Sequence, residues 1–340
     1  MATRIEVMDL LRGMAILGVV IGHISAETLY EKIPLPGLFF NQLIRFAVPV
    51  FIFLSGLGLS LSRKPRLSYS HFIWDRLRKL MPLYTFWSFV YLIVGDSTAQ
   101  PLTLERAGLA LISGGAAYHL YFIPLILQFY LVFPYLEQYF RRTSGLLVAL
   151  AITLALQFVK IYLPLPVPWV YFIDQRNFLG WLFYFALGIW CAPRLPLVER
   201  WAKQRETLLF FLLLPALGGL TIEALLYLKQ GWGLNLALTQ MRPSVLLYSL
   251  VVGLWVWASS PWPAGVKSCL AFLARLSYDL FLIHVFVLTL FTRFYLSTGQ
   301  KRATLLYGCS ALVVVLAGSL FLALTERGLV KRYGRGRKGD

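Results

Sequence analysis

Long apolar stretches recur along the chain, separated by short segments that carry charged residues, proline and glycine. A helix needs about 20 apolar residues to cross a hydrocarbon layer of about 30 Å. Stretches that approach this length lie at residues 8–26, 38–61, 79–95, 119–136, 145–163, 177–192, 207–228, 243–260, 269–292 and 304–325. Their apolar residues are continuous and do not alternate with polar ones, which favours helices over barrel strands. The pattern predicts an all-α polytopic membrane protein with about ten transmembrane helices.

Composition and charge agree with this prediction and also predict the orientation of the chain in the membrane. Hydrophobic residues make up 59% of the 340 positions and charged residues only 14%, against about 25% charged in soluble domains. Lys and Arg are concentrated in the loops on the side of the N-terminus and in the tail. Because positive loops mark the cytoplasm, both termini are predicted to be cytoplasmic. Residues 1–328 then form one transmembrane domain, and residues 329–340 form a basic cytoplasmic tail.

The net charge of +17 does not indicate a nucleic-acid partner. Juxtamembrane Lys and Arg are attracted to the anionic lipids of the inner leaflet, so membrane lipids are the expected partner of these charges. The cysteines, Cys191, Cys269 and Cys309, have neither CxxC nor metal-ligand spacing, and no metal is expected. The chain has no Walker loop, GxGxxG or GxSxG motif, which disfavours transport driven by nucleotide hydrolysis.

The first apolar segment holds two cationic side chains, Arg12 and His23. Ionisable residues inside a membrane are costly and are more often functional than decorative. Eleven residues of helix give about three turns and a rise of about 16 Å, so both side chains share one face at different depths. His23 is suited to act as a general base, because imidazole titrates near neutral pH. Glu27 follows one turn later and is a weaker candidate to orient the ring.

Several motifs, in this order along most of the chain, resemble the acyltransferase-3 family of integral membrane acyltransferases. They are the Arg12-x10-His23 spacing, the run Val-Pro-Val-Phe-Ile-Phe-Leu-Ser-Gly at 48–56, the Arg-rich entry at 76–84, the segment His-Leu-Tyr-Phe-Ile at 119–123 with Tyr130 and Pro134, and the run Leu-Ser-Tyr-Asp-Leu-Phe-Leu-Ile-His at 276–284. Asp279 and Phe281 depart from the family pattern, which has a small residue and Tyr at these positions. Tyr121 stands where Trp is common.

The resemblance implies transfer of an acyl group, usually acetyl, from cytoplasmic acyl-CoA to a hydroxyl of a cell-envelope glycan or lipid-linked sugar on the outer side. It places the protein in the plasma (inner) membrane of a bacterium. Arg76 and Arg78, with Arg12, are candidates to hold the CoA phosphates through charge-assisted hydrogen bonds. The positive-inside rule alone also accounts for Arg76 and Arg78.

The resemblance also suggests roles for residues in the later spans. Ser55, Tyr130 and Tyr84 are candidate donors to a tetrahedral oxyanion, and His119 and His284 are candidates to line the acceptor path. For Gly56, close packing of helices is the preferred interpretation, because small residues let membrane helices approach.

Two other functions stay open at this point. Buried His and Arg among ten helices also suit a proton-coupled transporter of glycans or small molecules, although paired half-helices are not evident in the sequence. A scaffold for polysaccharide assembly would tolerate loss of both Arg12 and His23.

Overall fold

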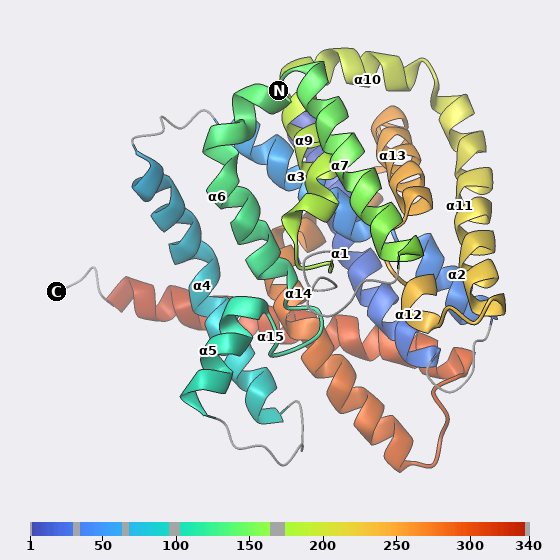
Figure 1. Cartoon of the computed structure of the whole chain (residues 1–340). Coiled ribbons are helices and arrows are strands. Elements are labelled where there is room, and N and C mark those ends of the chain that lie inside the picture. The colour runs from blue at the N-terminus through green and yellow to red at the C-terminus, as the bar shows by residue number, and fades with distance from the viewer. Residues whose placement is uncertain (1, 30–34, 63–67, 95–102, 164–173, 337–340) are drawn as a thin grey trace.

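The computed structural model describes residues 2–29, 35–62, 68–94, 103–163 and 174–336, and all regular elements in these ranges are helical (Figure 1). The helices are α1 (Ala2–Thr28), α2 (Leu35–Leu43), α3 (Ala47–Leu61), α4 (Tyr69–Val94), α5 (Leu104–Ser113), α6 (Phe122–Phe140), α7 (Thr143–Tyr162), α9 (Leu182–Cys191), α10 (Leu195–Lys203), α11 (Glu206–Lys229), α12 (Leu234–Ala237), α13 (Pro243–Ala258), α14 (Ala264–Ser297) and α15 (Leu305–Gly336), with 3-10 turns η1 (Phe178–Trp181) and η2 (Ala192–Arg194).

Each of the ten predicted stretches lies on helix, and the prediction of an all-α membrane protein is confirmed. Within the described ranges, seven helical segments are long and apolar enough to cross a membrane: Glu6–Thr28, Leu35–Leu61, Thr143–Tyr162, Phe178–Lys203, Glu206–Lys229, Ala264–Ser297 and Leu305–Gly328. The helix α13 is apolar but shorter. The number ten and the cytoplasmic side of the termini stay predictions. The sequence also offers two weaker segments, 102–117, which could be interfacial, and the Pro-interrupted run 161–173. The first contains α5, and residues 164–173 of the second lie outside the described residues.

The second predicted span, 38–61, is broken in its first half. A turn at residues 44–46 separates α2 from α3, and it is closed by hydrogen bonds from the Arg45 amide to the Gln42 carbonyl and from the Ala47 amide to the Ile44 carbonyl, both 3.0 Å. Non-helical backbone at membrane depth is tolerated only where protein buries it or where it lines a polar cavity. The break therefore marks the place where a cavity is expected.

Close helix crossings hold the bundle together. A Cβ built on Gly56 of α3 would lie 2.2 Å from the carbonyl oxygen of Phe185 in α9. One on Gly188 would lie 2.2 Å from the carbonyl oxygen of Phe53, on the same crossing. Glycine alone permits this approach, as the packing interpretation of Gly56 proposed. A Cβ on Gly13 would similarly meet the Leu270 carbonyl oxygen at 2.3 Å, where α1 packs on α14.

An ion pair joins α14 to α15. Arg327 Nε donates to Asp279 Oδ2 at 2.6 Å, and Arg327 Nη2 donates to the Arg275 carbonyl at 2.7 Å. Asp279 is buried, with 4% of its surface exposed. The carboxylate at the position where the family pattern has a small residue thus has a guanidinium partner on the neighbouring helix, which makes its burial tolerable.

Candidate functional site

Three histidines from separate parts of the chain lie together. His23 comes from α1, His119 from the turn before α6, and His284 from α14. The ring centroids are 5.2 Å apart for His23 and His284, 5.1 Å for His119 and His284, and 6.1 Å for His23 and His119. The sequence suggested a role for each of them separately, and the structure brings them into one cluster.

The hydrogen bonds of these rings define which nitrogens are available. His284 Nδ1 lies 2.9 Å from the Leu280 carbonyl oxygen. Because a carbonyl only accepts, Nδ1 carries the proton and Nε2 presents a lone pair. His284 Nε2 is buried and makes no hydrogen bond of good geometry, and the same holds for both ring nitrogens of His119. Buried polar atoms without a partner are rare and point to a ligand or water.

The cluster borders a polar cavity of about 710 Å³, a size suited to a small-molecule ligand. Its lining includes His23, His119, Glu27, Asn41, Arg45, Tyr118, Tyr121, Phe122, Lys160, Asp174, Gln175, Trp232, Asn235, Thr239, Gln240 and Phe281. These residues come from the C-terminal part of α1, the end of α2 and the break after it, the turn before α6 and the start of α6, the end of α7, the segment before η1, the segment around α12, and α14. Polar groups and a tryptophan are thus gathered from segments far apart in sequence.

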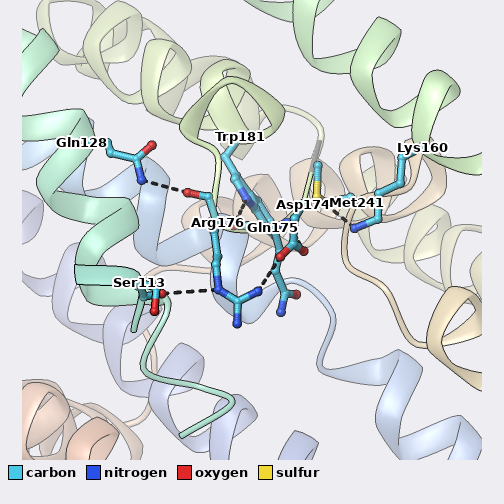
Figure 2. A network of polar contacts seen from close by, with 8 residues as sticks. All are labelled: Ser113, Gln128, Lys160, Asp174, Gln175, Arg176, Trp181 and Met241. Carbon is cyan, nitrogen blue, oxygen red and sulfur yellow. Dashed lines mark hydrogen bonds and ion pairs between the residues drawn. The ribbon is translucent and has the colours of Figure 1, made fainter. Parts of the chain in front are cut away.

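One wall of the cavity is the segment that precedes η1, shown in Figure 2. Asp174 Oδ2 and Arg176 Nη1 form an ion pair at 2.5 Å, and Arg176 Nε donates to the Ser113 carbonyl at 3.3 Å. Gln128 Nε2 donates to the Arg176 carbonyl at 2.8 Å, and Trp181 Nε1 donates to the Gln175 carbonyl at 2.9 Å. This network ties the wall to α5, α6 and η1, and so fixes the shape of the cavity.

A second polar cluster surrounds Tyr130 of α6. The Arg76 guanidinium lies over the Tyr130 ring, with 5.5 Å from Cζ to the centroid. Tyr130 also interacts electrostatically with Arg12 and is within hydrogen-bonding reach of Ser55. Arg76 Nε is buried without a hydrogen-bond partner. Four predicted site residues, Arg12, Ser55, Arg76 and Tyr130, are therefore brought together, at a different level from the histidines.

An aromatic layer lies between the two clusters. Phe51 is one turn from Ser55 on α3, and its ring centroid is 6.1 Å from that of Phe122. Phe122 and Phe281 are 5.5 Å apart and line the histidine cavity. Arg12 does not line this cavity. Arg12 and His23 share one face of α1 but do not line one common cavity, and these aromatic rings pack between the two clusters.

The remaining predicted residues lie elsewhere. Arg78 is 67% exposed in its side chain and pairs with Asp75 at 3.5 Å, away from Tyr130. Glu27 lines the cavity, but its carboxylate pairs with Arg302 at 2.9 Å. The hydroxyl of Tyr84 donates to the Leu111 carbonyl at 2.7 Å. Ser55 and Tyr130 are absent from the lining of the histidine cavity, so the structure gives no support to an oxyanion role for them beside His23.

Two cations of the cavity, Arg45 and Lys160, were missed as site residues from the sequence. The signal for Arg45 was an arginine inside an apolar run, three residues before Val48. Lys160 stands near the end of a span, where a lysine is ordinary. Among the described residues, no group of three or more His, Cys, Asp or Glu side chains is placed to hold a metal ion.

Comparison with known families supports the enzymatic class. The family model Acyl_transf_3, described as an acyltransferase domain, matches residues 5–324. No curated protein and no solved structure matches the chain significantly. The match covers both polar clusters and nearly the whole chain, and the chain therefore belongs to the acyltransferase-3 family of membrane acyltransferases.

Proposed function

We propose that the protein transfers an acyl group, acetyl in the simplest case, from cytoplasmic acyl-CoA to a hydroxyl of a cell-envelope glycan or lipid-linked sugar on the outer side of a bacterial inner membrane. The observation that carries the proposal is the cluster of His23, His119 and His284 beside a polar cavity. Acyl transfer to a hydroxyl needs a base at the acceptor oxygen, and buried neutral imidazoles are suited to that task.

His23 is the general base in this proposal, because it lines the cavity directly. It takes the proton of the acceptor hydroxyl as the oxygen attacks the thioester carbonyl. The tetrahedral intermediate then breaks its C–S bond, and the CoA thiolate leaves as the free thiol after it takes the proton from His23. His284 packs beside it at 5.2 Å, and its fixed Nδ1 proton keeps Nε2 toward the cluster. His119 packs on His284 with 5.1 Å between the ring centroids, and it is the candidate to donate an N–H to the developing oxyanion.

The second cluster is the proposed site for the phosphates of acyl-CoA, the co-substrate that supplies the activated thioester. Arg12 and Arg76 bring two guanidinium groups to Tyr130. The buried, unpartnered Nε of Arg76 fits an anionic ligand, because guanidinium groups bind phosphates through paired hydrogen bonds. The side chains of Phe51, Phe122 and Phe281 must separate for the acyl end to reach His23.

Purified protein in liposomes tests the proposal. With acetyl-CoA on one side and an envelope glycan fraction on the other, we expect release of free thiol together with acetylated glycan detected by mass spectrometry. A proton-coupled transporter would move unmodified glycan across the membrane without thiol release. Absence of both thiol release and acylated product would overturn the proposed function.

Arg76 and Arg78 provide a matched pair on one helix. Arg76→Gln removes the cation beside Tyr130, and we expect the KM for acetyl-CoA to rise about tenfold, as for the loss of one charge-assisted contact. Arg78→Gln removes an exposed cation paired with Asp75, and we expect less than a twofold change. Initial rates across acetyl-CoA concentrations measure both. Equal effects of the two variants on the KM would exclude a specific role of Arg76 in binding acetyl-CoA. The positive-inside rule would then account for both arginines.

A further inference from the structure

Arg45 is a buried cation of the histidine cavity that has no carboxylate partner in the part of the chain that the structure describes. Only 7% of its surface is exposed, and it lines the cavity at the break between α2 and α3. Its Nη2 donates to the Asn41 side-chain oxygen, while its Nε is buried without a hydrogen-bond partner. Within the described ranges, no carboxylate is close enough to form an ion pair with it. Arg242 is the charged residue that acts on it most strongly, and its like charge is repulsive.

Lys160 is a second cation of the same cavity. Its Nζ donates to Met241 Sδ at 3.4 Å (Figure 2), and a thioether is a weak acceptor. Asp174 attracts it from beyond ion-pair distance, but that carboxylate is bound to Arg176 at 2.5 Å. The other carboxylate of the lining, Glu27, is bound to Arg302 at 2.9 Å. Both carboxylates of the cavity are thus matched by cations outside this pair.

Among the described residues, neither of these two cations has a carboxylate within ion-pair distance. Removing a guanidinium from water without a counter-ion is costly, so such a group is retained where it serves a ligand. Arg45 also lies close enough to His23 to interact with it electrostatically, which places the cation beside the proposed base. A neutral ligand would leave both charges unmatched, whereas a carboxylate or phosphate would match them through charge-assisted hydrogen bonds.

We propose that the acceptor carries an anionic group, a carboxylate or a phosphate, which Arg45 and Lys160 bind while the acceptor hydroxyl faces His23. The assignment of this ligand as the acceptor rests on the proposed function. The anion site itself rests only on the geometry of Arg45 and Lys160. Trp232, in the same lining, stacks on Tyr227 and is 42% exposed, which leaves indole surface for contact with a sugar ring.

Calorimetric titration of the purified full-length protein in lipid nanodiscs tests the anion site without any acyl transfer. The probes are glucose, glucuronate and glucose 1-phosphate. We expect at least one anionic probe to bind tenfold or more tightly than glucose. The tighter of the two anions identifies the source as carboxylate or phosphate. Arg45→Gln is expected to remove this preference, and Lys160→Gln to reduce it severalfold.

Lys301→Gln is the matched control, because Lys301 is exposed and outside the cavity lining. It removes one positive charge and is expected to leave the preference unchanged. Thermal unfolding shows whether each variant is folded, and Lys160→Gln keeps the test valid if Arg45→Gln does not fold. Equal binding of glucose and the anions, no binding of any probe, or an unchanged preference in both cavity variants would overturn the proposal.

The outcome is separable from the proposed function. If the protein prefers the anionic probes but releases no thiol from acetyl-CoA, the proposed acyl transfer is overturned and the anion site is supported. If the protein releases thiol and acylates neutral glycans but binds the three probes equally, the proposed acyl transfer is supported and the anion site is overturned.

Discussion

Replacing His23 by alanine is expected to lower the rate of acyl transfer by about a thousandfold, within the range of 10² to 10⁴ that general base catalysis contributes. His23 is the histidine of α1 that lines the polar cavity, and it packs against His284 at 5.2 Å. Without it, the acceptor hydroxyl meets no base positioned at that point. Thiol release from acetyl-CoA in the presence of acceptor measures the effect, at saturating concentrations of both substrates.

His71→Ala is the matched control for this prediction. His71 lies on α4 with 54% of its side chain exposed, and it pairs loosely with Asp75 at 3.8 Å. Removing it takes away an imidazole outside the cavity, and the rate is expected to stay within twofold of the unaltered protein. A His23→Ala protein that is folded and retains a third or more of the activity would exclude His23 as the base.

The helical elements were largely predictable from the sequence, because few backbone structures can span a lipid bilayer. Continuous apolar runs must satisfy their backbone internally, so each predicted stretch lies on helix. The break between α2 and α3 was not predicted, since residues 38–61 are apolar throughout except for a few polar positions such as Asn41 and Arg45. Only the tertiary structure shows that the break lies at a cavity wall.

The candidate site was predictable where its residues share one helix. The spacing of Arg12 and His23 gives a common face without any knowledge of the fold. The meeting of His23 with His119 and His284 depends on three segments separated by many residues, and periodicity within each segment carries no information about it. The resemblance to the family singled out His119 and His284 as candidate site residues. It did not single out Arg45 or Lys160, since only the packed structure shows that neither forms an ion pair with a described carboxylate.

Arg76 and Arg78 show a further limit of sequence reasoning. Both belong to one basic cluster, and the sequence assigned them the same role. Residues two positions apart on a helix are separated by about 200° around its axis. Arg76 and Arg78 therefore point in nearly opposite directions. Arg76 lies over the Tyr130 ring, whereas Arg78 is exposed beside Asp75. The helical geometry alone separates the pair, but only the neighbouring helices decide which of the two faces inward.

Gly56→Ala is expected to destabilise the protein by about 2 to 3 kcal/mol, in the upper part of the usual cost of overpacking a well-packed site, and to lower the unfolding temperature by about 3 to 4 °C. The new Cβ would lie 2.2 Å from the Phe185 carbonyl oxygen, and backbone at a helix crossing cannot yield as a flexible side chain does.

Gly253→Ala is the matched control, since Gly253 is inside α13 with nothing within 4 Å of its Cβ position. Alanine there is expected to be neutral or to stabilise by up to about 1 kcal/mol, because it favours the helix. Tryptophan fluorescence during thermal unfolding in detergent measures both variants. Equal midpoints would mean that the α3–α9 crossing tolerates a methyl group, and that close packing is not the reason for glycine at position 56.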